Sequence, residues 1–258
     1  MIASRGRARL TAIAVVVTLA VAVLAGVLAL AGSSGCGLPA DRACLRVLFI
    51  GNSYTSTNDL PGVLASLLRS GGRHAEVSAI APGGATLADH AASAEVAGAI
   101  IGSPWTAVIL QEQSLLPAAP DLLEGQILPA ARTLADAARG TGAQVYLFQT
   151  WAHRDGWPER RLDRAAMQAA ISATDRELAG RLGLVVAPVG EAWARALREA
   201  PGIALWQADG SHPTAAGTYL AACVLYASLT GRSPVGLGET GGLPAADAAT
   251  LQRIAAEP

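Results

Sequence analysis

The feature of this sequence that most restricts its fold is an alternation of short apolar runs with longer helical stretches. The apolar runs are rich in β-branched residues, and the intervening stretches carry apolar residues at helical spacing. The predicted strands are 45–50, 75–81, 106–112, 144–150 and 184–188. The predicted helices lie near 60–71, 86–100, 121–140, 160–182, 191–200 and 213–230. This order predicts an α/β fold, a three-layer α/β/α sandwich around a five-stranded parallel sheet.

The N-terminal segment differs in character from the rest of the chain. It opens with three basic residues, Arg5, Arg7 and Arg9. An uncharged apolar run follows, long enough to cross a bilayer as one helix. We expect residues 1–35 to form a cleaved signal peptide or a retained signal anchor, 36–44 a linker, and 45–258 one α/β domain. Both alternatives place the domain outside the cytoplasm, either secreted or anchored to the membrane by the N-terminal helix.

The three cysteines fit an exported protein. Cys36 and Cys44 are close enough in sequence to close a small loop by a disulfide, which an oxidising compartment would favour. Cys36 also follows a small-residue stretch that partly resembles a bacterial lipoprotein site, although Ser33 stands where an aliphatic residue is expected. Cys223 lies in an apolar helical run and is predicted to be a small buried hydrophobe.

Charge and motifs exclude several function classes. Charged residues make up 15% of the 258 residues and the formal net charge is -1, so nucleic acid is not an expected partner. The chain has neither a dinucleotide-binding glycine motif nor a Walker loop, and it lacks the G-x-S-x-G nucleophile elbow. Its four histidines are not spaced as metal ligands. We therefore expect no cofactor and no metal.

Residues that follow the predicted strands are the first candidates for a site, because open parallel sheets bind ligands at the carboxyl ends of their strands. The first strand, LRVLFI, runs into a Gly-Asn-Ser turn that places Ser53 before a helix. The Ser53 hydroxyl could act as a nucleophile, and its N–H could stabilise negative charge. The alternative is an ordinary turn in which Ser53 caps the helix.

A second candidate segment precedes the last long helix, which we expect to begin at Pro213. Asp209 and His212 are three residues apart and can face each other on one turn. The carboxylate could hold one ring nitrogen of His212, which leaves the other to take a proton from a serine hydroxyl. A surface aspartate beside a helix-capping histidine is the alternative.

Together, FIGNSYT and DGSHPTAAG resemble the SGNH (GDSL-like) hydrolase family, over residues 45–230. The resemblance implies a flavodoxin-like fold and ester hydrolysis with Ser53 as nucleophile, His212 as base and Asp209 orienting it. Asn52 departs from the family, which more often has aspartate there.

The resemblance also implies an oxyanion hole. The Ser53 N–H would contribute to it, with Gly84 after the second strand. The third donor in the family is an asparagine side chain, and Gln113 falls at that position here, with Gln111 as a substitute. Glu112 alternates to the other side of the strand and is expected to be a structural hydrogen-bond acceptor.

The segment after the fourth strand gathers groups suited to a substrate wall, because sugar rings stack on indoles. These groups are Trp151, His153, Arg154 and Trp157, of which Trp151 and His153 are the predicted substrate-binding residues. An ordinary aromatic loop is the alternative. His74 and His90 are predicted to lie on the surface.

These observations predict an exported serine esterase that hydrolyses carboxylic esters, with O-acetyl groups on glycans as the first candidate substrate. A lipid or small-ester esterase is the alternative within the same class. A non-catalytic glycan-binding surface protein on the same fold is the alternative from another class, because the altered third oxyanion donor could weaken catalysis. The sequence predicts no oligomeric state.

Overall fold

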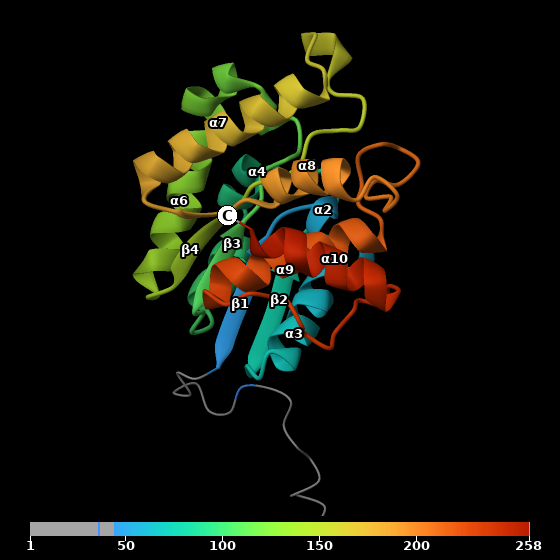
Figure 1. Ribbon diagram of the computed structural model, residues 1–258. Coiled ribbons are helices and arrows are strands. Elements are labelled where there is room, and N and C mark those ends of the chain that lie inside the picture. The colour runs from blue at the N-terminus through green and yellow to red at the C-terminus, as the bar shows by residue number, and fades with distance from the viewer. Residues whose placement is uncertain (1–35, 37–43, 258) are drawn as a thin grey trace, which may run out of the picture.

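The computed structural model describes residue 36 and residues 44–257 (Figure 1). The predicted signal peptide or anchor and the lipoprotein-like stretch therefore lie outside the described residues. Within the part that is described, no helix is both long enough and apolar enough to cross a membrane.

The sheet has five strands, as predicted, and all neighbouring pairs are parallel in the order β2-β1-β3-β4-β5. The strands are β1 (Leu45–Ile50), β2 (Ala75–Ile80), β3 (Ala107–Leu110), β4 (Gln144–Phe148) and β5 (Val185–Ala187). The interior strand β1 is apolar from Val47 to Ile50 because both of its faces are covered there. Val47 and Phe49 belong to one core cluster, whereas Leu48 and Ile50 belong to the other.

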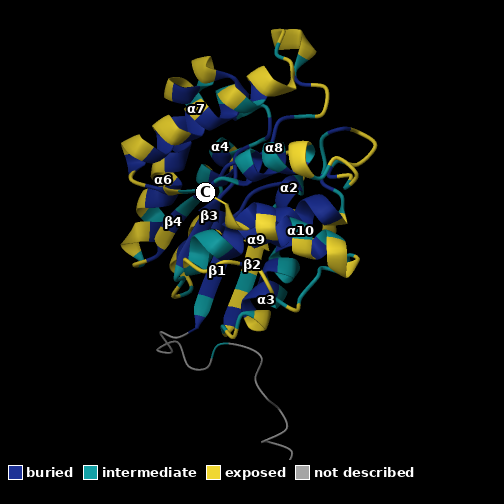
Figure 2. Cartoon of the chain, viewed as in Figure 1, coloured by how far each residue is buried: buried dark blue, intermediate teal, exposed yellow. Residues whose placement is uncertain are grey.

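Helices cover both faces of the sheet, which confirms the three-layer sandwich (Figure 1). One face packs against α3 (Leu60–Ser70), α8 (Val189–Glu199), α9 (Ala215–Thr230) and α10 (Ala245–Ala256). The other packs against α4 (Leu87–Ala91), α5 (Ala94–Ile101), α6 (Leu128–Gly140) and α7 (Arg164–Leu182). Short helical segments lie in the connections between these elements. They are α2 (Ser53–Ser56), Thr57–Asp59, Leu116–Ala118, Pro120–Leu122, Leu123–Ile127 and Pro158–Arg160. Buried residues line β1, β3 and the inner helix faces, whereas the edge strand β2 is mostly intermediate or exposed (Figure 2).

Several predicted helix boundaries were wrong because side-chain caps and tight turns set the real ones. The stretch 86–100 holds two helices, since the Ser93 side chain accepts a hydrogen bond from Val96 N and starts a second helix. The stretch 121–140 begins with tight turns, and its α-helix starts only at Leu128. The last long helix begins at Ala215 with Thr214 as its cap, so Pro213 lies outside it.

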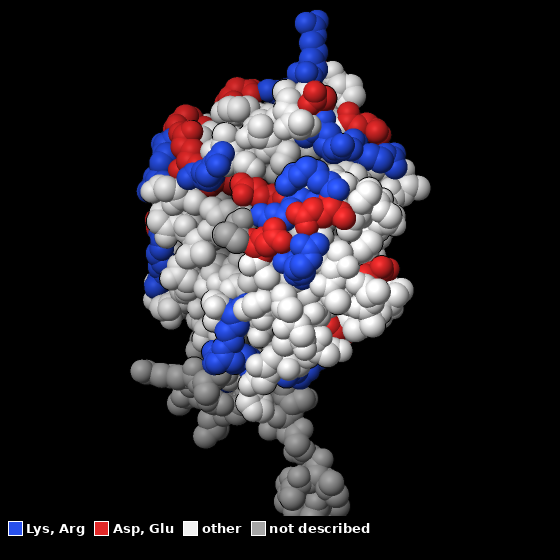
Figure 3. Space-filling view, in the orientation of Figure 1, with Lys and Arg blue, Asp and Glu red and all other residues white. Residues whose placement is uncertain are grey.

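The predicted disulfide is present and joins Cys36 to Cys44, with Cα atoms 5.4 Å apart. Cys223 is fully buried in α9, as expected. Acidic and basic side chains are interspersed over the face formed by α8 and α10 (Figure 3). That face therefore carries no continuous field of one sign.

Candidate active site

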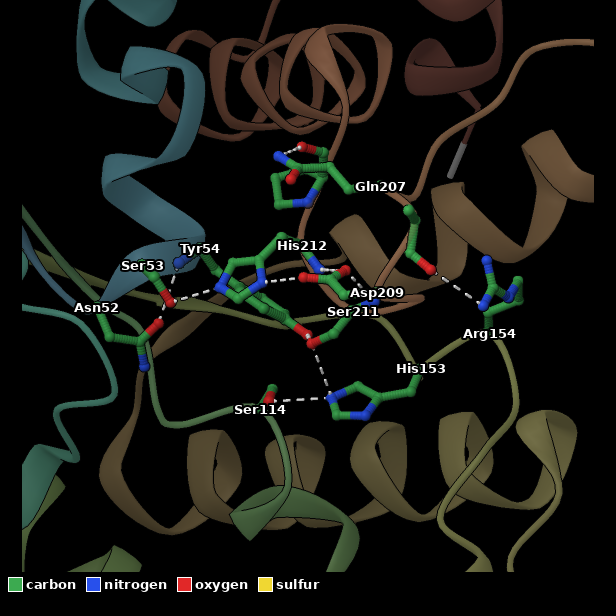
Figure 4. A network of polar contacts seen from close by, with 12 residues as sticks. Asn52, Ser53, Tyr54, Ser114, His153, Arg154, Gln207, Asp209, Ser211 and His212 are labelled. Atoms are coloured by element: carbon green, nitrogen blue, oxygen red, sulfur yellow. Dashed lines mark hydrogen bonds and ion pairs between the residues drawn. The ribbon is translucent and has the colours of Figure 1, made fainter.

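Ser53 lies at the carboxyl end of β1, as the first residue of the short helix α2 (Figure 4). The cap of this helix is Asn52, whose side-chain oxygen accepts a hydrogen bond from Tyr54 N at 3.1 Å. The alternative in which Ser53 is the cap is therefore wrong. Gly51 is required before the turn, since a Cβ there would lie 2.5 Å from Thr55 Oγ1.

Ser53, His212 and Asp209 form a continuous hydrogen-bonded chain (Figure 4). His212 Nε2 lies 2.9 Å from Ser53 Oγ, and His212 Nδ1 lies 2.6 Å from Asp209 Oδ2. With the proton on Nδ1 and donated to the carboxylate, the Nε2 lone pair faces the serine hydroxyl. The pair predicted from the sequence and the predicted nucleophile are therefore in contact, although 159 residues separate His212 from Ser53.

Asp209 is held by its own turn. Partial desolvation opposes ionisation, but the pKa of Asp209 is nevertheless lowered, because the carboxylate accepts hydrogen bonds from Ser211 N, the His212 ring and His212 N. The two backbone bonds to Oδ1 measure 2.9 Å and 3.0 Å. The carboxylate is therefore ionised at neutral pH and fixed in its orientation.

A pocket of about 270 Å³ opens beside Ser53. Its lining includes all three predicted oxyanion groups, Ser53, Gly84 and Gln113. Gly84 has a φ of +74°, a conformation that glycine adopts without strain. The side-chain oxygen of Gln113 accepts a hydrogen bond from Leu115 N at 2.8 Å, so its amide nitrogen is the end left to donate to a ligand.

Gln111 cannot serve as the substitute donor. Its side chain is fully buried, and its Oε1 accepts hydrogen bonds from Asn52 N and Thr55 Oγ1, each at 3.0 Å. Its Nε2 donates to Asn52 Oδ1 at 3.0 Å and to Glu112 O at 2.6 Å. Because both amide hydrogens are used, the predicted substitute role is wrong.

Glu112 is a structural acceptor, as predicted. Its Oε1 accepts hydrogen bonds from Leu87 N at 3.0 Å and from Gln113 N at 2.7 Å. Burial raises the pKa of Glu112, an effect that these two N–H donors oppose. The side chain thereby fixes the backbone that carries Gln113.

Trp151 is a core residue, so its predicted place in the substrate wall is wrong. It is only 1% exposed and stacks between Tyr54 and Trp193, with ring centroids at 4.6 Å and 4.0 Å. Its Nε1 donates to Ser211 O at 3.0 Å. Trp151 therefore supports the turn between Asp209 and His212 from beneath.

His153 does line the pocket, where its Nε2 lies 3.1 Å from Ser114 Oγ and 3.3 Å from Ser211 Oγ. The Tyr54 hydroxyl lies 2.6 Å from Ser211 Oγ. Burial lowers the pKa of His153, and burial raises the pKa of Tyr54 to about 12. The network is therefore uncharged at neutral pH. Sequence reasoning missed Tyr54, Ser114 and Ser211, although each directly adjoins a predicted residue.

The other predicted wall residues lie outside this pocket. Arg154 is exposed, and its backbone N donates to Gly210 O at 2.8 Å, which joins its loop to the Asp209 turn. Trp157 packs under the Arg160 guanidinium, 5.0 Å from the ring centroid.

His90 was predicted to lie on the surface, and this was wrong. It is only 3% exposed, and its Nε2 lies 2.7 Å from Gly51 O, so it supports the turn before Ser53. His74 is exposed, as predicted. Among the described residues, no group of three or more His, Cys, Asp or Glu side chains could hold a metal ion.

A parallel α/β sandwich with a serine, histidine and aspartate chain at the carboxyl edge of its sheet is an arrangement found in hydrolases. The chain belongs to the SGNH hydrolase family. It is 32% identical to a protein from Slackia heliotrinireducens described as an SGNH hydrolase, over 72% of this chain and 99% of that one, with a TM-score of 0.62.

Two further solved structures share the fold. A DUF4886 family protein from Bacteroides uniformis is 20% identical over 82% of this chain and 93% of that one, with a TM-score of 0.71. A variant of an acetyl-xylooligosaccharide esterase from a Geobacillus is 16% identical over 72% of this chain and 92% of that one, with a TM-score of 0.53. No protein-family model and no curated protein matches the chain.

Proposed function

We propose that this protein is an exported serine esterase that removes short acyl groups, above all O-acetyl groups, from glycans. The observation that carries the proposal is the pair of distances through His212, 2.9 Å to Ser53 Oγ and 2.6 Å to Asp209 Oδ2. A serine hydroxyl becomes a competent nucleophile when an oriented imidazole can take its proton.

The reaction follows from these positions. Ser53 Oγ attacks the ester carbonyl while His212 Nε2 takes the hydroxyl proton, and the oxyanion is stabilised by Ser53 N–H, Gly84 N–H and the Gln113 amide. Collapse of this intermediate breaks the bond to the alcohol, which leaves with the proton from His212. Water then attacks the acyl enzyme with His212 again as base, releasing the acid and restoring Ser53.

The substrate class rests on the size and polarity of the pocket. Pockets for drug-sized ligands span about 300–1,000 Å³. The pocket beside Ser53 measures about 270 Å³, which favours a short acyl group over a fatty acyl chain. Its wall includes Ser114, His153 and Ser211, which suit the hydroxyl groups of a sugar. Acetylated xylo-oligosaccharides are the substrates named for one protein of the same fold.

Export is part of the proposal. The apolar run in residues 1–35 is read as a cleaved signal peptide or an anchor. The disulfide between Cys36 and Cys44 supports an oxidising compartment.

The test is release of p-nitrophenol from p-nitrophenyl acetate and octanoate by the purified full-length chain. We expect acetate to be preferred, and Ser53→Ala to lower kcat by about 10⁴-fold to 10⁶-fold because it removes only the nucleophilic oxygen. Ser56→Ala is the matched control, since Ser56 is an exposed serine on the same helix. It should retain native turnover.

Turnover by Ser53→Ala close to the native rate would show that Ser53 is not the nucleophile. Preference for octanoate would indicate lipid esters instead. If acetylated xylo-oligosaccharide binds but no acetate is released, the non-catalytic glycan-binding function replaces the esterase.

A further inference from the structure

A second cavity, of about 260 Å³, lies outside the pocket that contains Ser53. It is formed between α7, α8 and the loop that precedes the Asp209 turn. The residues that give it chemical character are Arg164, Trp193, Arg198 and Trp206.

The two cavities lie against neighbouring residues of the same two loops. Ala152 lines the second cavity and the next residue, His153, lines the first. Trp206 lines the second cavity and pairs through a β-bridge with Pro213, the neighbour of His212. A ligand in the second cavity is therefore held beside the proposed catalytic residues without contacting them.

Aromatic side chains run from one cavity to the other. Tyr54 stacks on Trp151, and Trp151 stacks on Trp193 at a centroid distance of 4.0 Å. Trp206 lies 5.7 Å from Trp193, and the half-buried Trp206 ring has the Arg164 guanidinium 5.8 Å from its centroid. Indole rings beside guanidinium groups suit a ring with an apolar face and a negative charge.

The charge of this cavity is unbalanced. Arg164 and Arg198 are both exposed, no acidic residue is part of the lining, and neither arginine takes part in an ion pair within the described part of the chain. Their acidic neighbours in sequence are occupied elsewhere. Asp163 caps α7 by accepting from Ala166 N at 2.8 Å, and Glu199 pairs with Arg253 at 2.9 Å. Arg198 Nη1 donates to Ala194 O at 3.0 Å, so its other N–H groups and the Arg164 guanidinium are left for a ligand carboxylate, which arginine binds with paired hydrogen bonds.

We infer that this cavity is a subsite for an acidic sugar, in which a uronic acid ring stacks on Trp206 and its carboxylate pairs with Arg164 and Arg198. The volume suits one sugar ring and is small for a longer segment. The inference rests on the proposed function in taking the ligand to be part of the same glycan, and it narrows the substrate class to acidic glycans.

The experiment compares methyl β-D-glucuronide with methyl β-D-glucoside, which differ only in the carboxylate. Each is titrated into the full-length native chain, with tryptophan fluorescence and calorimetry as readouts. We expect the glucuronide to bind at least about 10-fold more tightly, because hydrogen bonds between charged groups are the stronger class. Arg164→Gln and Arg198→Gln should each weaken its binding by about 10-fold.

The matched control is Arg132→Gln, which removes an exposed positive charge from α6, is not part of the cavity lining and should leave binding unchanged. Trp206→Phe should retain part of the affinity and Trp206→Leu should lose it. Melting temperatures show whether each variant is folded.

Equal affinity for the two glycosides would overturn the inference, as would glucuronide binding that neither arginine replacement weakens. Full displacement of the glucuronide by equimolar inorganic phosphate would also overturn it, because it would indicate a plain anion site. Serine-dependent ester turnover without glucuronide binding would leave the proposed function standing alone. Glucuronide binding that needs both arginines, without ester turnover, would leave only the subsite.

Discussion

Replacement of Asp209 by asparagine tests whether the His212 ring depends on its carboxylate. Asp209 Oδ1 accepts two backbone N–H groups, and Oδ2 faces His212 Nδ1 at 2.6 Å. An asparagine at this position would keep the backbone bonds through its oxygen and turn its NH₂ toward Nδ1. Two donors would then oppose each other, so the ring would move its proton to Nε2. That nitrogen could no longer accept the proton of Ser53.

The expected loss of kcat follows from the solvent exposure of the His212 and Asp209 side chains. In a fully buried triad the same change lowers kcat about 10⁴-fold. Here the side chains of His212 and Asp209 are 35% and 47% exposed, so solvent screens part of the charge interaction. The tautomer effect does not depend on screening. We therefore expect a loss of about 10³-fold in kcat, or about 4 kcal/mol at 1.36 kcal/mol per factor of ten.

The assay is steady-state hydrolysis of p-nitrophenyl acetate by the full-length Asp209→Asn chain, with its melting temperature measured in parallel. Asp155→Asn is the matched control, because Asp155 is a nearby exposed aspartate that pairs with Arg154 at 3.4 Å. It removes the same charge without touching His212 and should retain native turnover. A kcat for Asp209→Asn within about tenfold of native would refute the orientation argument.

Other consequences can be measured on the same preparations. Gln113→Ala should lower kcat about 10²-fold to 10³-fold, as loss of one oxyanion donor does. Gln111→Ala should instead mainly lower the free energy of unfolding, by about 1–3 kcal/mol, because it leaves buried partners unpaired. Trp151→Ala should lower that free energy by about 3–5 kcal/mol in urea unfolding; loss of glycan affinity with unchanged stability would instead place the ring at the surface. The lowered pKa of Asp209 means that its contribution to stability is present above the ordinary pKa of about 3.9 and is lost as the pH falls through the folded value. Native and Asp209→Asn chains should therefore converge in stability in acid, and a constant difference down to pH 2 would contradict this.

The sheet and the position of the site could be predicted because both depend on local sequence patterns. The five strands are apolar runs, and parallel strands must place their carboxyl ends at one edge. Ser53, Gly84 and Gln113 each follow a different strand, and the pocket confirms that they meet there. Asp209 and His212 are three residues apart on one turn, so their contact is local.

Burial of single side chains could not be predicted, because it depends on which distant element covers them. Trp151 sits at a strand end like His153, but it faces the core cluster that includes Trp193 on α8, whereas His153 faces the pocket. His90 lies on a short helix next to the exposed Asp89, and the approach of Gly51 O gives its ring a buried partner. No periodicity in the sequence distinguishes such residues from surface ones.

Asn52, which stands where the family more often has aspartate, forms one structural unit with Gln111. Asn52 N donates to Gln111 Oε1, and Gln111 Nε2 donates back to Asn52 Oδ1, both at 3.0 Å. Asn52 Nδ2 donates to Ala85 O at 3.0 Å, a bond that an aspartate could not make. The amide at position 52 therefore joins the loop that carries Gly84 to the loop that carries Gln113. Since the proposed oxyanion donors come from these loops and from the serine turn itself, this pair of amides sets their relative positions.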